Sequence, residues 1–130
     1  MKNKRDFVVA GLVLVALMSV GVAIFATPRG AGAYDGFAQC LEEKGAIFYG
    51  AFWCPHCQNQ KKLFGKSASL LPYVECSTPD GKSQKEICKT EKIEGYPTWV
   101  FADGSRESGV QSFELLAEKT ACVLPVVPAN

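Results

Sequence analysis

The alternation of apolar and polar positions predicts a small α/β domain that follows one long apolar segment. Ala46 to Phe52 is apolar or small throughout, which is typical of a buried strand. Asp103-Gly104 separates two short strand-like runs and is a strong hairpin signal. The predicted elements are helix 37–44, strand 46–52, helix 54–64, strand 72–76, helix 83–92, strands 98–102 and 105–110, and a last helix that Ser112 caps and that runs to 120. This order predicts an α/β fold with a four-stranded mixed sheet and helices on both faces.

The N-terminal segment has the features of a signal anchor. Residues 1–6 are basic, and 7–26 then run about twenty residues without a charge, which is long enough to cross a bilayer as a helix. Ala31-Gly32-Ala33 resembles a cleavage site but lies well past the apolar run, so an uncleaved anchor is favoured over a cleaved peptide. A buried core helix is the weaker alternative, because the run is apolar on all faces. The positive-inside rule then puts the rest of the chain outside the cytoplasm.

The sequence divides into three parts. An anchor and linker occupy 1–33, a single domain 34–124, and a tail 125–130. The formal net charge of +1 gives no electrostatic reason to expect a nucleic-acid partner. We therefore predict a single-pass protein of the cell membrane, with its domain in the periplasm or on the outer face.

Cys54-Pro55-His56-Cys57 is the most informative motif. It lies between a predicted strand and a predicted helix, so Cys54 faces unpaired N–H groups and the positive end of the helix dipole, which favour a thiolate. Cys57 follows one helical turn later and can reach the first sulfur. This spacing predicts a dithiol/disulfide switch, with Cys54 as the nucleophile and Cys57 as the resolving thiol. His56 can donate a hydrogen bond or positive charge to the thiolate, although a lone histidine is more often an inert surface residue. Pro55 fixes the first helical turn.

Two other uses of paired cysteines fit poorly. A zinc site needs a second close cysteine pair, and the only histidine here lies between Cys54 and Cys57. Attachment of a c-type haem needs a histidine after the second cysteine, where Gln58 stands. We therefore expect no metal and no cofactor, because the two thiols carry the chemistry themselves.

Six cysteines in 130 residues indicate an oxidising compartment. We interpret Cys76 and Cys88 as a structural disulfide closing a loop of about a dozen residues, with free buried thiols as the alternative. That pairing leaves Cys40 and Cys122, which would tie the first helix to the end of the last. Four cysteines allow three connectivities, so this second bridge is the more open of the two.

Two motifs, Trp53-Cys54-Pro55-His56-Cys57 and Gly95-Tyr96-Pro97-Thr98-Trp99, resemble those of the thioredoxin superfamily. With Tyr49 to Phe52 and Tyr73-Val74-Glu75-Cys76, they more narrowly resemble the thioredoxin-like domain associated with bacterial vitamin K epoxide reductase homologues. The resemblance covers essentially all of 34–124 and implies a thioredoxin-like fold.

The resemblance also implies roles for the second motif. Pro97 is expected to be cis and to hold the backbone of Tyr96 beside the active disulfide, where a substrate strand can pair with it; an ordinary trans proline is the alternative. Trp53, Pro55 and Tyr96 are expected to face the substrate, whereas Trp99 is expected in the core. The family's buried aspartate is replaced by Phe48. Glu75 is an alternative proton acceptor, although a solvated carboxylate on an edge strand is the favoured interpretation.

The Pro-His dipeptide matches that of the DsbA family and favours oxidation of substrates. The sequence as a whole predicts a membrane-anchored thiol–disulfide oxidoreductase that oxidises or isomerises exported protein thiols. Its expected partner is a quinone-linked membrane oxidase of the vitamin K epoxide reductase type, as the resemblance implies. A disulfide reductase of the cytochrome c maturation type and a non-catalytic substrate-docking module are the alternatives.

Overall fold

The computed structural model describes residues 30–124 and 126. Its elements in chain order are α2 (Asp35–Glu43), β1 (Ile47–Gly50), α3 (Pro55–Phe64), the 3-10 helix η1 (Gly65–Leu70), β2 (Tyr73–Glu75), α4 (Glu86–Thr90), β3 (Thr98–Val100), β4 (Arg106–Ser108) and α5 (Phe113–Thr120). The predicted anchor, 7–26, lies outside the described residues. Within residues 30–124 and 126, no helix is long and apolar enough to cross a membrane.

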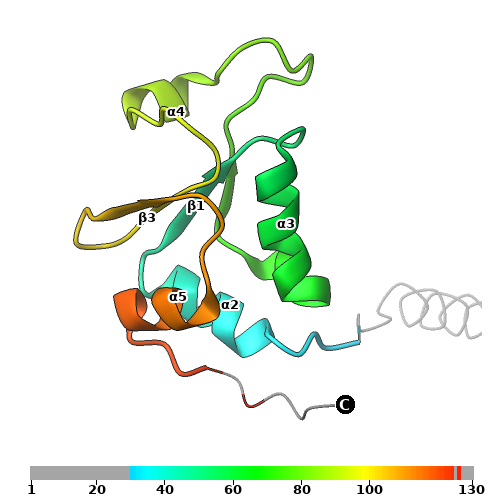
Figure 1. Ribbon diagram of the computed structural model, residues 1–130, viewed down its shortest axis with the longest axis vertical. Helices are drawn as coiled ribbons and strands as arrows, with labels where there is room; N and C mark the ends of the chain where they lie inside the picture. Colours follow the sequence, from blue (N-terminus) through cyan, green and yellow to red (C-terminus); the bar gives the residue numbers. More distant parts are fainter. Residues whose placement is uncertain (1–29, 125, 127–130) are drawn as a thin grey trace, which may run out of the picture. The chain divides into compact units, whose positions relative to one another are not determined.

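The four strands form one sheet in the order β2-β1-β3-β4 (Figure 1). β1 pairs in parallel with β2 and antiparallel with β3, and β3 pairs antiparallel with β4. The predicted four-stranded mixed sheet is therefore confirmed. β1 lies inside the sheet, which explains why its sequence carries no charged residue: both of its faces are covered.

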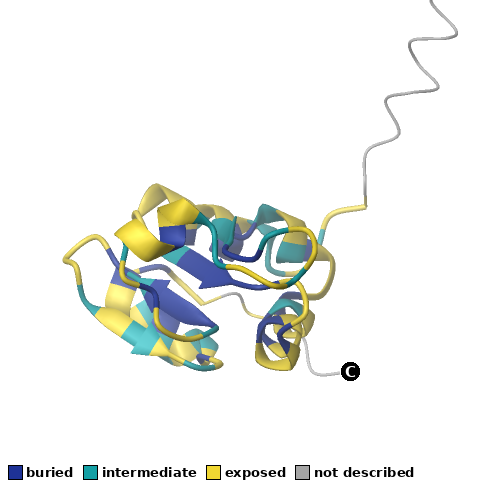
Figure 2. Ribbon diagram, turned by 90° about the horizontal axis from the view of Figure 1, so that it is seen from above, coloured by how far each residue is buried: buried dark blue, intermediate teal, exposed yellow. Residues whose placement is uncertain are grey.

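Alternate residues of β1 enter two different cores. Phe48 belongs to the larger cluster, which α2, α3 and α5 cover, whereas Tyr49 belongs to a smaller cluster beside α4. Phe48 stacks on Trp99 of β3 with ring centroids 4.9 Å apart, and both side chains are fully buried. Figure 2 shows that the buried residues are concentrated on the inner strands, β1 and β3, with more exposed helices and loops around them. The period-two pattern of the strand thus sets which side chains lie under α3.

One buried polar side chain joins α3 to the segment before α5. Gln60 is fully buried, and its Oε1 accepts hydrogen bonds from Gln111 N at 2.7 Å and from Trp99 Nε1 at 3.3 Å. Its Nε2 donates to Gln111 O at 3.1 Å. Because its donor and acceptor are both paired, this amide can be buried without a large desolvation cost. It fixes α3 against β3 and the segment before α5.

The helix ends follow the predicted signals. Gly45 has φ +75° just after α2, and Gly65 has φ +55° just after α3, a backbone region that glycine adopts most easily. Ser112 accepts a hydrogen bond from Leu115 N at 3.2 Å and is the N-cap of α5, as predicted.

The helix predicted over 83–92 is much shorter in the structure, where α4 covers only Glu86–Thr90. Hydrogen bonds and a β-bridge hold the preceding residues in a loop: Thr78 N donates to Ser83 O at 2.9 Å, and Ser77 pairs with Gln84. At the other end, Lys92 has φ +52°. The prediction of a long polar helix was wrong because these contacts with the preceding segment outweigh helix propensity.

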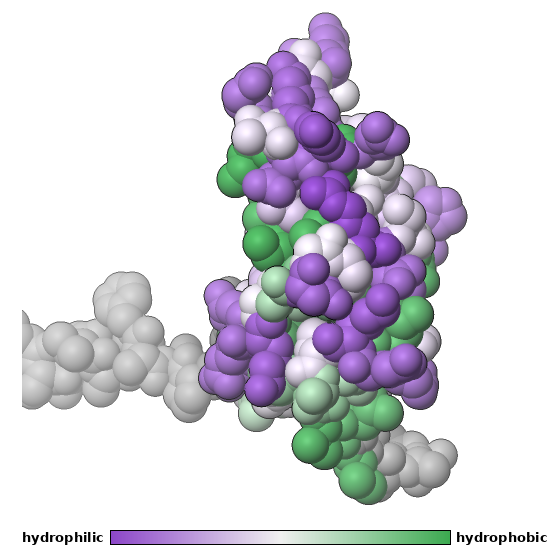
Figure 3. All heavy atoms as spheres, turned by 90° about the vertical axis from the view of Figure 1, so that its left-hand side faces the viewer, coloured by the Kyte–Doolittle hydropathy of each residue, from purple (hydrophilic) through white to green (hydrophobic). Residues whose placement is uncertain are grey.

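One face of the molecule is largely hydrophilic, with hydrophobic residues gathered at its lower end (Figure 3). The last described residues of the chain include exposed apolar side chains, since Val123 and Val126 are 87% and 97% exposed. Elsewhere, the large exposed hydrophobic side chains include Phe52 and Trp53, which lie immediately before the first cysteine of the motif.

Candidate active site

A turn between β1 and α3 places Cys54 at the start of the helix. β1 ends at Gly50, and Cys54 N donates to Ala51 O at 3.0 Å, which closes the turn. Cys54 is the N-cap of α3, and Pro55 takes the first helical position. The cysteine therefore lies where the helix presents its unpaired N–H groups and the positive end of its dipole.

The loop before β3 packs against Cys54. Cys54 Sγ lies 3.5 Å from Tyr96 O and donates a hydrogen bond to it, and the Tyr96–Pro97 peptide bond is cis. Pro97 is fully buried. The pairing of β1 with β3 brings these segments together. The structure thus joins the two motifs that the sequence singled out, although they are about forty residues apart.

Cys57 is the more deeply buried thiol, 1% exposed against 5% for Cys54. Burial raises the pKa of Cys57 from its ordinary value of 9.0 to about 12, and a hydrogen bond to Cys54 and the charge of that group act in the same direction. The Ala51 backbone and the positive charge of Lys61 oppose the rise. Cys57 is therefore protonated at neutral pH. Both thiols are buried, and Cys54 is the slightly more exposed of the two.

His56 and Pro55 lie on the exposed surface beside the cysteines. Within the described part of the chain, His56 makes no hydrogen bond to Cys54, so its predicted role stays a prediction. No cluster of three or more histidine, cysteine, aspartate or glutamate residues that could hold a metal ion is found over 30–124 and 126.

A pocket of about 200 Å³ is lined by Trp53, which precedes Cys54 in the chain, and by Tyr96, which contacts the Cys54 sulfur. Its lining residues are Trp53, Ser77, Gly81, Lys82, Ser83, Gln84 and Tyr96. Trp53 is half exposed; its ring lies 6.0 Å from that of Tyr96, and its Nε1 donates to Ser77 Oγ at 2.9 Å. Gln84 Nε2 donates to the Tyr96 hydroxyl at 2.9 Å. Two of the residues predicted to face the substrate, Trp53 and Tyr96, thus form one side of a polar-rimmed pocket, and the third, Pro55, does not line it.

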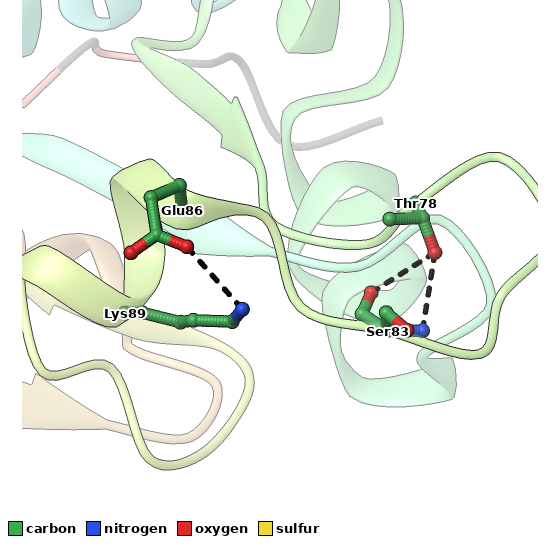
Figure 4. A network of polar contacts seen from close by, with 4 residues as sticks. All are labelled: Thr78, Ser83, Glu86 and Lys89. Atoms are coloured by element: carbon green, nitrogen blue, oxygen red, sulfur yellow. Dashed lines mark hydrogen bonds and ion pairs between the residues drawn. The ribbon is translucent and has the colours of Figure 1, made fainter.

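The opposite wall of the pocket is the loop between β2 and α4. Thr78 Oγ1 lies 3.1 Å from Ser83 N and 3.2 Å from Ser83 O, so the loop is cross-linked at its base (Figure 4). Lys89 and Glu86 form an exposed ion pair at 3.3 Å on α4. Such a pair contributes little to stability. The hydrogen bonds at the base of the loop, and not this ion pair, shape the pocket.

Glu75 is neither free in solvent nor isolated. It lies on the edge strand β2, as expected, but its Oε1 accepts from Ser77 N at 2.9 Å and from Phe52 N at 3.2 Å. Its Oε2 accepts from the Tyr73 hydroxyl at 2.7 Å. The favoured interpretation of a merely solvated carboxylate was therefore wrong. Glu75 fixes the backbone just before the motif and holds the Tyr73 ring.

The sequence analysis missed two residues of this site, Tyr73 and Lys61. The Lys61 ammonium lies 3.3 Å from the centroid of the Tyr73 ring. Burial raises the pKa of Tyr73, and its hydrogen bond to Glu75 adds to this effect. The sequence did contain two hints: Tyr73 and Glu75 alternate on one strand, and Lys61 follows Cys57 by four residues on a helix.

Both structural disulfides are present. Cys76 and Cys88 are bonded across 12 residues and tie the end of β2 to α4. Cys40 and Cys122 are bonded across 82 residues and tie α2 to the segment that follows α5. Cys54 and Cys57 are free thiols. Phe48, at the position of the family's buried aspartate, packs edge-on against Tyr73 at 5.0 Å.

Comparison with known proteins places the chain in a family of thiol–disulfide proteins. The family model described as Thioredoxin matches residues 34–121. The thiol-disulfide oxidoreductase LTO1 of Arabidopsis thaliana is 46% identical over 88 residues, which are 64% of this chain and 23% of that protein. The protein disulfide isomerase-like 5-1 of rice, Oryza sativa subsp. japonica, is 30% identical over 102 residues, or 70% of this chain and 69% of that protein. The chain thus spans less than a quarter of the Arabidopsis relative.

Proposed function

Because the chain belongs to the thioredoxin family, we propose that it is a thiol–disulfide oxidoreductase that oxidises exported protein thiols through Cys54 and Cys57. The observation that carries this proposal is the position of Cys54, at the helix N-terminus, with its sulfur against Tyr96 O and beside the pocket. A protein segment bound along Trp53 and Tyr96 would bring its own cysteine to Cys54.

The oxidising reaction needs no other group in the site. A substrate thiolate attacks Cys54 Sγ of the Cys54–Cys57 disulfide; a mixed disulfide forms and Cys57 leaves as a thiolate, which takes up a proton. The second substrate thiolate then attacks the substrate sulfur of the mixed bond. The substrate leaves with its disulfide, Cys54 is released as a thiolate, and the two electrons stay in the protein dithiol.

The direction of transfer is proposed from the Pro55-His56 dipeptide. A group that stabilises the Cys54 thiolate stabilises the reduced protein, which makes the disulfide a stronger oxidant. The span of such effects is large, since reduction potentials of about −270 mV for thioredoxin and about −120 mV for DsbA differ by roughly 7 kcal/mol for two electrons. His56 is exposed and is the second residue of α3, from where its side chain can turn toward the Cys54 thiolate.

The direct test is the reduction potential of the full chain, measured by equilibration with glutathione. We expect a value less negative than about −200 mV for the wild type. His56→Ala should be more reducing, whereas Asn59→Ala, a change at an exposed position one turn further along α3, should not move the potential. A wild-type value near that of thioredoxin would contradict the oxidase and favour the alternative of a disulfide reductase.

We further propose that the chain is held at the cell membrane by residues 7–26 and is reoxidised there by a quinone-linked oxidase of the vitamin K epoxide reductase type. The uncharged run after a basic start supports the anchor, and the resemblance of the motifs to those of the domain associated with that oxidase supports the partner. Anchoring of both proteins in the same membrane would raise the effective concentration of each for the other.

Cell fractionation together with a membrane-impermeant thiol reagent tests the location. We expect the chain in the membrane fraction, with Cys54 alkylated from outside the cytoplasm. A soluble exported chain would contradict the anchor, and protection of Cys54 in intact cells would contradict the topology. In either case the Cys54–Cys57 chemistry would stand, because it rests on other residues.

A further inference from the structure

Tyr73 and Glu75 of β2 and Lys61 of α3 form a group of side chains beside Cys57 and outside the cysteine motif. The first contact of this group is between Tyr73 and Cys57. Gly50 faces both partners of this contact: a Cβ placed on Gly50 would lie 2.8 Å from Tyr73 Cε2 and 2.9 Å from Cys57 Sγ. The edge of the tyrosine ring and the sulfur of the resolving cysteine are therefore neighbours across the glycine. Glu75 follows Tyr73 on the same face of β2.

Lys61 joins this group from the helix. It follows Cys57 by four residues, so both side chains project from the same face of α3. Its ammonium sits 3.3 Å above the centre of the Tyr73 ring, within the range of a cation–π interaction. Lys61 is only half-buried, but the ring keeps its charge at the sheet instead of in solvent.

The ring itself is held in place. The Tyr73 hydroxyl donates to Glu75 Oε2 at 2.7 Å, and Glu75 Oε1 is held by Phe52 N and Ser77 N. A hydroxyl that donates to a carboxylate makes its ring more electron-rich, which strengthens attraction to a cation above it. The backbone N–H groups of Phe52 and Ser77 thus fix Glu75. Glu75 in turn holds Tyr73, and the Tyr73 ring holds the Lys61 ammonium.

Cys57 needs such a charge. It is buried, it must form a thiolate to react, and Phe48 offers no proton acceptor beside it. The titratable groups around it are Cys54 and Lys61 on α3 and Tyr73 on β2, with Glu75 behind the tyrosine. Of these, Cys54 disfavours ionisation of Cys57, whereas Lys61 favours it.

We propose that Lys61, held over Tyr73 by the hydrogen bond from Tyr73 to Glu75, stabilises the thiolate of Cys57 during disulfide exchange. Tyr73 and Glu75 are positioning residues in this proposal. The role rests on the assignment of Cys54 and Cys57 as the redox pair and holds for both directions of transfer. In oxidation of a substrate, Cys57 is the thiolate that leaves when Cys54 is attacked. In resolution of a mixed disulfide, the Cys57 thiolate attacks Cys54 Sγ, the Cys54–Cys57 bond forms and the partner leaves as a thiolate.

The test follows the resolution step alone. The full-length chain is reduced at Cys54 and Cys57 and mixed with oxidised glutathione, and the decay of the mixed disulfide between Cys54 and glutathione is timed by acid quenching from pH 6 to pH 9. The variants are Lys61→Gln, Lys61→Arg and Tyr73→Phe. Lys62→Gln is the matched control, because Lys62 carries the same charge on the exposed side of the same helix.

We expect Lys61→Gln to shift the rate profile to higher pH. Each pKa unit of lost stabilisation leaves about tenfold less thiolate, while each thiolate becomes about threefold more nucleophilic, so resolution slows about threefold at neutral pH per unit lost. Lys61→Arg should restore the wild-type profile, since a guanidinium also binds over an aromatic ring. Tyr73→Phe keeps the ring but loses the bond to Glu75, and should slow resolution by a smaller factor.

Two results would overturn the proposal. One is an unchanged profile in Lys61→Gln, and the other is an equal change in Lys62→Gln, which would indicate a general effect of net charge. Thermal unfolding of each variant separates a loss of fold from a loss of charge. Wild-type chain that forms no mixed disulfide and no Cys54–Cys57 bond would overturn the redox function as well, so the two failures are distinguishable.

Discussion

The cysteine pair at the start of α3 and the pair that joins α2 to the segment after α5 differ in bonding and in their surroundings. Cys54 and Cys57 are free thiols three positions apart in the chain, and Trp53, which precedes Cys54, lines a pocket. Cys40 and Cys122 are bonded, and 82 residues separate them. Cys54 and Cys122 are equally buried, but Cys54 is at a helix N-terminus with a hydrogen-bond partner in Tyr96 O, whereas Cys122 follows the end of the last helix.

Loop length explains much of the difference. In the chain-entropy model, closing the long loop stabilises the fold by about 4.5 kcal/mol, the loop between Cys76 and Cys88 by about 3 kcal/mol, and a four-residue loop by only about 2 kcal/mol. A bond between Cys54 and Cys57 would therefore stabilise the fold least of the three, and breaking it would cost the least. The short spacing suits the redox switch that we propose, and the long spacing makes a structural link.

The largest expected effect is on the active pair. Cys54→Ala should abolish disulfide exchange, because Cys57 is buried and protonated at neutral pH. Cys57→Ala should instead accumulate mixed disulfides through Cys54, seen as slower bands on non-reducing gels. Urea unfolding of the reduced chains should change little in either variant. Exchange that survives in Cys54→Ala would contradict the assignment of roles.

Removal of the long-range bridge should have the largest effect on stability. Replacing Cys40 and Cys122 by serine should lower the free energy of unfolding by about 4 to 5 kcal/mol. The bridge lies away from the pocket, so the rate of exchange at low temperature should stay near that of the wild type. A comparable loss of activity in the folded variant would show that this end of the molecule is coupled to the site.

Loss of the bridge between Cys76 and Cys88 should have a smaller effect on stability, and a larger effect on function, than loss of the bridge between Cys40 and Cys122. Its replacement by two serines should cost about 3 kcal/mol, because the closed loop is shorter. This loop carries Ser77 and Gln84 of the pocket wall, so KM for a reduced peptide substrate should rise with little change in kcat. An unchanged KM would mean that the pocket wall does not bind substrate.

The smallest effect concerns pH. The pKa of Cys57 is raised from 9.0 to about 12 in the folded chain, chiefly by burial. Above pH 9 the unfolded chain loses this proton before the folded chain does, so stability is fully present below pH 9 and falls as pH rises toward 12. Cys54→Ser should therefore lose stability above pH 9 faster than the variant with Cys57→Ala added. Parallel curves for the two would contradict the raised pKa.

The sequence predicted the strands, the mixed sheet and the position of the motif well, because these depend on local patterns. Ala46 to Phe52 is apolar enough to be recognised as buried. Gly45 and Gly65 mark helix ends whatever the helices pack against. The nearness of the two motifs came from the resemblance to a family and not from the pattern.

The rest depends on contacts between distant segments. Gln60 lies in a polar run and was not expected in the core, yet Trp99 and Gln111 satisfy its amide. The short α4 follows from hydrogen bonds across a loop, and the position of Lys61 over Tyr73 joins a helix to a strand. Propensity and spacing describe each segment alone, so they could not show these pairings.

The two tryptophans make the protein its own optical probe. Trp53 is half exposed beside the pocket, whereas Trp99 is fully buried against Phe48. Indole fluorescence shifts to longer wavelength as the ring meets water, so the two residues emit at separate wavelengths. Capture of a substrate will change the red component from Trp53, and unfolding will change the blue component from Trp99. One emission spectrum can therefore follow turnover and denaturation in the same cuvette without an added label.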